Sequence, residues 1–226
     1  MAMSINSAPS DLKITDVRFV DIDGAPKRCT LLKIMTNQGI EGYGEIRDTS
    51  SKPLAIDHFG HVCVEDCIRF AKRIEKYNIA WMEDMVPWIY TDQLVRLKNS
   101  TTVPVCTGED IYLKEGFETL IKAGAVSVIH PDILTCGGAL ELKKIGDIAA
   151  ENGVAVAIHM AESPVACMAA VHAAAAMQYV LALEFHSVDV PWWSDIVKDL
   201  PTPLIQNGFI KVPEKPGLGI DELNEE

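Results

Sequence analysis

Six ionisable residues recur along the chain at intervals of 23 to 27 residues, each directly after a short apolar run. If the runs are parallel β-strands, their carboxyl ends meet at one edge of the sheet, so these side chains would share one face. Carboxylates and an imidazole gathered there are suited to binding a cation and moving protons. The residues are Asp57, Glu83, Glu109, Asp132, His159 and Glu184.

The first three members of this series are carboxylates on successive runs: Asp57, Glu83 and Glu109. Three converging carboxylates repel one another unless a cation neutralises them. A ligand set made only of oxygen suits Mg²⁺ better than zinc, with water or substrate filling the remaining positions. The alternative is that each is a solvated or salt-bridged carboxylate at a strand end. We therefore predict an Mg²⁺ site formed by these three residues.

The next two members are Asp132 and His159, which end neighbouring runs. A carboxylate within reach of an imidazole orients its tautomer and raises its basicity, which suits a general acid or base. The alternative is a histidine satisfied by a backbone carbonyl. Glu184 closes the series and is predicted to hydrogen-bond or protonate a developing oxyanion, with a buried ion pair as its alternative.

Other residues near the strand ends carry weaker signals. Trp88 is predicted to line a pocket, although a core or interface role is an equal alternative. Four histidines flank strand ends and are expected to be structural or rim residues: His58, His61, His130 and His186.

The elements that must position these residues are short apolar runs alternating with amphipathic stretches, from residue 53 onward. Continuous apolar runs suit parallel strands covered on both faces, and the spacing leaves room for one crossover helix per strand. This pattern predicts an α/β fold, a (β/α) TIM-type barrel with six of its units visible. A doubly wound sheet is the alternative, but it gives no reason for an ionisable residue at every strand end.

The domain organisation follows from the same pattern. Residues 1–52 differ in character, with alternating runs at 14–22, 29–35 and 40–46 that predict antiparallel strands, and residues 53–204 carry the barrel units. Eight units of this size need about 200 residues, whereas 53–204 supply only 152. We hypothesise that a stretch containing two strands is omitted between about residues 50 and 53.

The composition of the chain argues against several classes of partner and of protein. The chain has 226 residues and a formal net charge of −12, which argues against nucleic acid and anionic membranes as partners. Its six cysteines are scattered without a disulfide framework, and the first fifteen residues lack the pattern of a signal peptide. The apolar stretch 164–185 is predicted to be a buried helix leading into a strand. The expected location is the cytoplasm.

Taken as a set, the strand-end motifs resemble the enolase superfamily, in its mandelate racemase-like branch of acid-sugar dehydratases. The resemblance covers nearly the whole chain and includes the tail at 208–220. The motifs are Ala-Ile-Asp at 55–57, Met-Glu-Asp at 82–84, Thr-Gly-Glu-Asp at 107–110, His-Pro-Asp at 130–132, Ala-Ile-His at 157–159 and Leu-Glu-Phe-His at 183–186.

This resemblance implies an α+β capping domain, represented by residues 1–52 and joined by a returning segment at 205–226. It implies that Mg²⁺ binds a sugar-acid carboxylate and that the proton α to this carboxylate is abstracted. His159 with Asp132 would act as acid/base, and Glu184 would support the enolate. The loop with Asp23 and Arg28, together with Trp88, would contact the substrate.

The same resemblance implies dehydration as the reaction and a homo-oligomer as the assembly. Alternatives are a racemase, epimerase or cycloisomerase of the same superfamily, or a truncated non-catalytic paralogue. The chain departs from the family pattern in lacking the basic residue of the second barrel strand. It also has Phe59 where some sugar-acid dehydratases place a histidine.

Overall fold

The computed structural model describes residues 11, 13–22, 29–39, 41–47, 55–58, 62–187, 190–220 and 222–224. The chain divides into two compact units, residues 1–54 and residues 55–226. Each unit is considered by itself. Asp23, Arg28, Phe59, His61 and the junction at 50–53 lie outside the described residues.

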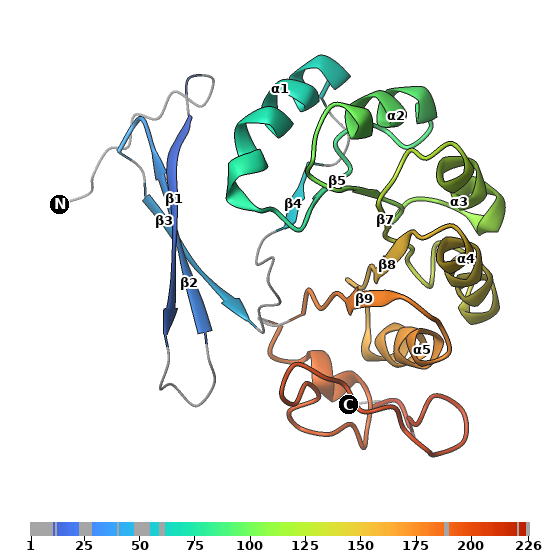
Figure 1. Ribbon diagram of the computed structural model, residues 1–226. Helices are drawn as coiled ribbons and strands as arrows, with labels where there is room; N and C mark the ends of the chain where they lie inside the picture. The colour runs from blue at the N-terminus through green and yellow to red at the C-terminus, as the bar shows by residue number, and fades with distance from the viewer. Residues whose placement is uncertain are drawn as a thin grey trace. The chain divides into compact units, whose positions relative to one another are not determined.

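The first unit contains a three-stranded antiparallel sheet in the order β1-β2-β3 (Figure 1). Its strands are β1 (Ile14–Ile22), β2 (Cys29–Thr36) and β3 (Glu41–Arg47). Asn37 follows β2, and its side chain connects this turn to the chain before β1. Its amide donates to the carbonyl of Asp11 at 2.9 Å, and its Oδ1 accepts from the backbone N–H of Lys13 at 2.7 Å. The structure confirms the predicted antiparallel strands.

The second unit contains six parallel strands in the order β4-β5-β6-β7-β8-β9, with helices along one face of the curved sheet (Figure 1). This arrangement confirms the six predicted β/α units. The strands are β4 (Ala55–Asp57), β5 (Trp81–Glu83), β6 (Val105–Thr107), β7 (Val128–Ile129), β8 (Ala155–Ile158) and β9 (Val180–Leu183). The helices are α1 (Val64–Ile74), η2 (Glu75–Tyr77), α2 (Thr91–Asn99), α3 (Leu113–Lys122), α4 (Ala139–Glu151), α5 (Pro164–Ala175) and η3 (Trp193–Ile196).

Helix α1 shows how the sequence specifies this layer. Val64, Cys67, Ala71 and Ile74 are buried, and their spacing places them on one face of the helix. Acidic residues occupy its first turn and basic residues its last, which complements the helix dipole. Helix α5 begins at a proline, which is favoured in the first turn of a helix. It is rich in alanine and is buried over most of its surface. No helix in the described part of the chain is long and apolar enough to cross a membrane.

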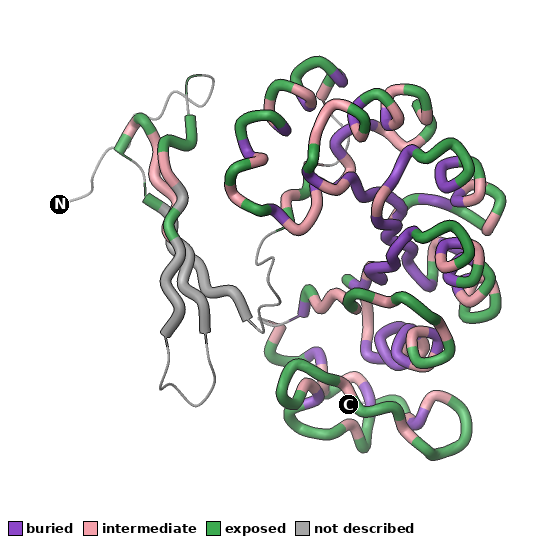
Figure 2. Tube along the Cα trace, in the orientation of Figure 1, coloured by how far each residue is buried: buried purple, intermediate pink, exposed green. Residues whose placement is uncertain are grey.

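The core lies between the sheet and its helices, where Figure 2 shows the buried residues concentrated. Every residue of β6 and β8 is buried, whereas β4 and β9 are partly exposed. Within the described residues, these two outer strands each pair on one side only. The chain after β9 packs on α5 through Trp193 and Leu204. The predicted return of residues 205–226 to a capping domain stays a prediction.

The turn after β6 allows a test of how tightly the strand ends are packed. At Gly108 φ is +151°, and an added Cβ would lie 2.8 Å from Cε1 of Phe117 and 2.9 Å from the backbone nitrogen of His130. Gly108→Ala should therefore lower the free energy of unfolding by about 1–3 kcal/mol more than a change with no steric contact. Urea unfolding measures this difference.

Gly153→Ala is the matched control, because Gly153 also has a positive φ, +69°, but nothing within 4 Å of an added Cβ. It should show only the left-handed backbone penalty, about 1–2 kcal/mol. Equal losses in the two variants would contradict the tight packing at Gly108.

Candidate active site

The parallel register brings the ionisable residues to one end of the sheet in the second unit. Asp57 lies opposite Glu83 in the pairing of β4 with β5, and Asp132 lies opposite His159 just beyond β7 and β8. The backbone N–H of Glu184 donates to the carbonyl of Ile158 at 2.9 Å, which continues the pairing of β8 with β9. The side chains that the sequence predicted to share a face do so.

A group of three carboxylates forms at the ends of β4 and β5. Ligand oxygens of Asp57, Glu83 and Asp84 lie within 4.8 Å of one another. Glu83 is held by the indole N–H of Trp81, which donates to its Oε2 at 2.6 Å, and Asp84 accepts a hydrogen bond from the Thr107 hydroxyl. This donor set consists of hard oxygens and fits a divalent cation such as Mg²⁺.

Burial opposes the ionisation of two of these carboxylates, Glu83 and Asp84. It raises the pKa of Glu83 to about 7, and it also raises the pKa of Asp84. A divalent cation at the group would favour the ionised forms and release the protons. The electrostatics of the group therefore agree with its chemistry as a candidate metal site.

Asp84 was not among the predicted ligands. Its backbone conformation explains how its carboxylate reaches the same group as that of Glu83. Its φ is +43°, which is uncommon for a residue other than glycine. In a regular strand consecutive side chains point to opposite faces, so Glu83 and Asp84 would be expected to diverge. The left-handed turn at Asp84 breaks this alternation, and both carboxylates reach the same group.

Glu109 occupies a different position from the one expected of a third ligand. Its Oε2 lies 3.3 Å from Nε2 of His159, and it does not belong to the close group of Asp57, Glu83 and Asp84. Burial raises the pKa of Glu109, and the charges of Asp84 and Asp57 add to that effect. Its role as a metal ligand stays a prediction.

His159 and Asp132 form the predicted pair. Nδ1 of His159 donates to Oδ2 of Asp132 at 2.9 Å, and Oδ1 of Asp132 accepts from the backbone N–H groups of Leu134 and Thr135 at 2.7 and 2.9 Å. Burial alone would lower the pKa of His159, but Asp132, Glu109 and Glu184 outweigh it and raise that pKa to about 9. Burial opposes ionisation of Asp132 too, yet these hydrogen bonds lower its pKa to about 2.

His130 is the site residue that sequence reasoning undervalued. It is fully buried, its Nδ1 donates to the carbonyl of Ala157 at 2.6 Å, and its Nε2 lies 3.1 Å from Glu83 and 3.0 Å from Glu184. Neither carboxylate contact has the alignment of a hydrogen bond, so we describe both as ion-pair contacts. Burial favours neutral His130, but the two carboxylates prevail and raise its pKa. Its place directly after β7 was the available sequence signal.

Glu184 lies among three histidines. Its Oε2 contacts His130 at 3.0 Å and Nε2 of His186, also at 3.0 Å. Burial would raise the pKa of Glu184, but the contacts with His130 and the charges of His186 and His159 outweigh it and lower that pKa. Glu184 is therefore held as a carboxylate beside the His159–Asp132 pair.

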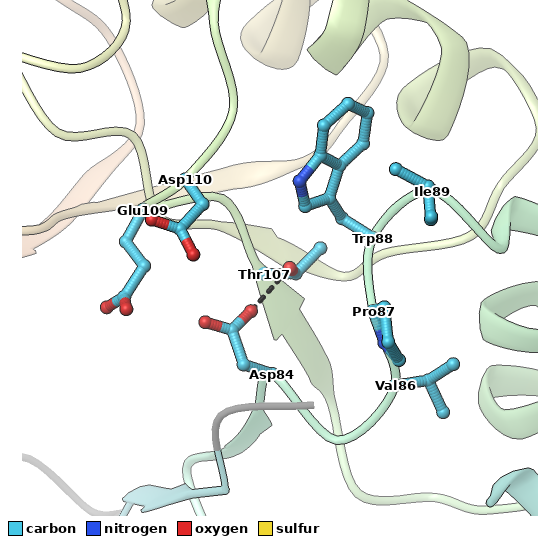
Figure 3. A pocket seen from close by; sticks show the side chains of 8 residues that line it. All are labelled: Asp84, Val86, Pro87, Trp88, Ile89, Thr107, Glu109 and Asp110. Atoms are coloured by element: carbon cyan, nitrogen blue, oxygen red, sulfur yellow. Dashed lines mark hydrogen bonds between the residues drawn. The ribbon is translucent and has the colours of Figure 1, made fainter. Parts of the chain in front are cut away.

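A cavity of about 230 Å³ opens beside the metal candidates (Figure 3). The carboxylates of Asp84, Glu109 and Asp110 point into the same part of it, and Trp88 stands on the other side. The predicted position of Trp88 on a pocket wall agrees with this view, and its contact with a substrate stays a prediction. The lining residues are Asp84, Val86, Pro87, Trp88, Ile89, Thr107, Glu109 and Asp110.

Comparison with known families gives a match over most of the sequence. The model of the family described as enolase C-terminal domain-like matches residues 25–226. The chain belongs to this family. Membership agrees with the six-stranded parallel sheet and with ionisable residues at its strand ends.

Individual proteins that are similar to this chain give finer comparisons. D-xylonate dehydratase of Haloferax volcanii is 43% identical over 152 residues, which cover 67% of this chain and 36% of that protein. D-galactarolactone cycloisomerase of Agrobacterium fabrum is 29% identical, over 74% of this chain and 46% of that protein. A mandelate racemase/muconate lactonizing enzyme-like protein from Rubrobacter xylanophilus superposes with a TM-score of 0.72 at 38% identity, over 76% of this chain and 43% of that one. The chain spans less than half the length of these relatives.

The geometry of the His159–Asp132 pair predicts a measurable change when the carboxylate is removed. In Asp132→Asn the pKa of His159 should fall from about 9 toward its usual 6.5, by about 1–2 units, because one opposite charge is lost. Glu109 and Glu184 remain, so the pKa should stay above the usual value. Titration of the His159 ring followed by NMR measures it, and an unchanged pKa would contradict the assigned pairing.

The same pair should make stability depend on pH. A raised pKa at His159 stabilises the fold below the usual 6.5, and this contribution is lost as pH rises through about 9. A lowered pKa at Asp132 stabilises the fold above the usual 3.8, and this contribution is lost as pH falls through about 2. Both contributions are fully present between pH 3.8 and 6.5. The difference in free energy of unfolding between the original protein and Asp132→Asn should therefore be largest in this range and shrink near pH 9.

Proposed function

We propose that the protein is an Mg²⁺-dependent dehydratase of a sugar acid, which removes the proton α to a carboxylate and eliminates water through a stabilised enolate. The observation that carries the proposal is the His159–Asp132 hydrogen bond of 2.9 Å beside a group of carboxylates suited to a divalent cation. The similarity to a D-xylonate dehydratase supports an aldonate as substrate.

The proposed metal ligands are Asp57, Glu83 and Glu109, with Asp84 as the competing third carboxylate. Glu109 is favoured because its contact with His159 is long, 3.3 Å, whereas Asp84 already accepts the hydroxyl hydrogen of Thr107. When bound, Mg²⁺ would supply the Lewis-acid charge that stabilises an enediolate, a contribution of several kcal/mol.

We assign the proton transfer to His159. Its Nδ1 is held by Asp132, so Nε2 is the atom that exchanges a proton with the substrate. With a pKa of about 9 the ring is protonated at neutral pH, which suits a general acid. In the balanced reaction, the neutral form of His159 would take the α-proton at Nε2, and the resulting imidazolium would give that proton to the departing β-hydroxyl, so that the hydroxyl leaves as water.

The developing enolate would be supported by Glu184 and its neighbour. His130 contacts Glu184 from within the protein at 3.0 Å and fixes the position of its carboxyl group. Transfer of a proton from the His130 imidazolium to the Glu184 carboxylate would allow Glu184 to donate a hydrogen bond to an enolate oxygen, which is the kind of preorganised stabilisation that speeds such reactions.

A cycloisomerase or epimerase is the second candidate, because a relative named D-galactarolactone cycloisomerase matches 74% of the chain. These reactions begin with the same enolate and differ in its fate. A 2-keto-3-deoxy acid as product supports dehydration, whereas an epimer or a ring-opened lactone supports the alternative.

Activity provides the main test. With Mg²⁺ and D-xylonate or another aldonate in deuterated water, we expect loss of the α-proton and formation of a keto acid, both followed by NMR. His159→Asn should lower kcat by about 10²–10⁴-fold, because it removes the general acid. Glu115→Gln, an exposed change in the first turn of α3, should keep the full rate. Absence of both exchange and product across a broad panel of acid sugars would favour a non-catalytic paralogue.

Metal binding can be tested without substrate by calorimetric titration with Mg²⁺. Glu83→Gln should weaken Mg²⁺ affinity by about tenfold or more, because it removes one charged ligand. Comparing Glu109→Gln with Asp84→Asn identifies the third ligand, and we expect Glu109→Gln to cost more. If only Asp84→Asn weakens binding, the proposed ligand set is wrong at Glu109. Glu115→Gln again serves as the control.

A further inference from the structure

A second group of metal-ligating side chains includes His159 and follows later strands of the sheet. We propose that His159, Glu184 and His186 form a transition-metal site that binds Zn²⁺. Ligand atoms of the three residues lie within 4.8 Å of one another. The group follows β8 and β9, whereas the carboxylate group follows β4 and β5.

The contacts within this group already place two of the donors together. Nε2 of His186 lies 3.0 Å from Oε2 of Glu184, and the ring centroids of His159 and His186 are 5.6 Å apart. Donors of a tetrahedral zinc ion with bonds of 2.0–2.1 Å are separated by about 3.4 Å. Side-chain rotation is therefore sufficient to convert the present contacts into ligation.

The surroundings of His159 favour a metal at Nε2. Its Nδ1 donates to Asp132, and Asp132 is fixed in turn by the backbone N–H groups of Leu134 and Thr135. A carboxylate hydrogen-bonded to the far nitrogen of a histidine is the usual support of a zinc ligand, since it sets the tautomer and raises the basicity of the ligating nitrogen. This arrangement leaves Nε2 of His159, which lies 3.3 Å from Glu109, as the nitrogen that does not contact Asp132.

The chemistry of the donors decides between metals. Two imidazole nitrogens and one carboxylate suit Zn²⁺ and its neighbours in the transition series, whereas Mg²⁺ prefers oxygen ligands alone. Three protein ligands leave a fourth position, which water or the Glu109 carboxylate, 3.3 Å from Nε2 of His159, can fill. An ion can enter from solvent because the His186 side chain is 54% exposed.

One consequence rests on the proposed function. Zinc at Nε2 of His159 would occupy the atom that is proposed to give a proton to the substrate. Micromolar Zn²⁺ would then inhibit a dehydratase that requires Mg²⁺. The binding itself does not depend on this activity and is tested separately.

The experiment is titration of the full chain with Zn²⁺ against a coloured chelator, in the presence of saturating Mg²⁺. We expect one Zn²⁺ ion per chain, and an affinity about tenfold or more lower in His186→Gln and in Asp132→Asn, which remove a ligand and its supporting carboxylate. Replacing Zn²⁺ with Co²⁺ should give the visible absorption of a four-coordinate site, and this absorption should be lost in His186→Gln. Circular dichroism checks that each variant is folded.

Three matched variants separate this site from other potential donors. Cys63→Ser removes an exposed thiol, and Glu162→Gln removes a carboxylate that lies near His159 and Asp132. Both should bind Zn²⁺ as the original protein does, and Glu83→Gln should also leave zinc affinity unchanged while it weakens Mg²⁺. The proposal is overturned if His186→Gln binds Zn²⁺ normally, or if saturating Mg²⁺ displaces the zinc.

Discussion

The electrostatic cost of gathering carboxylates at one end of the sheet governs the rest of this site. Parallel pairing aligns the strand ends, so it brings Asp57, Glu83 and Glu184 toward the same edge whether or not their charges are balanced. Buried His130 offsets part of that cost, because its Nε2 contacts both Glu83 and Glu184 while its Nδ1 donates to a backbone carbonyl. His159 plays the same part beside Asp132. The histidines therefore serve the fold as counter-charges before they serve any reaction.

Much of the architecture could be predicted because its cause is local. Short apolar runs alternating with amphipathic stretches specify the six β/α units, and the structure places strands at the expected runs. The His159–Asp132 pair was also predictable, since residues just beyond neighbouring parallel strands must lie side by side. In these cases the spacing along the chain translates directly into a position in space.

The parts that escaped prediction depend on backbone turns and tertiary packing. Asp84 joins the carboxylate group only through its positive φ, which no alternating pattern reveals. His130 precedes Asp132 by two residues, and only the packed sheet shows that its ring points inward to Glu83 and Glu184. Glu109 has the spacing of a metal ligand, but its flexible side chain allows it to face His159 in this structure. Spacing thus identifies strand-end residues without fixing the partner of each side chain.

The two donor groups share one sheet edge but differ in hardness, and that difference has a structural origin. The ends of β4 and β5 supply only carboxylates, whereas the chain after β8 and β9 supplies imidazoles around Glu184. Nε2 of His130 contacts Glu83 of the first group at 3.1 Å and Glu184 of the second at 3.0 Å. Neighbouring groups that differ in their oxygen and nitrogen ligands can select different metals.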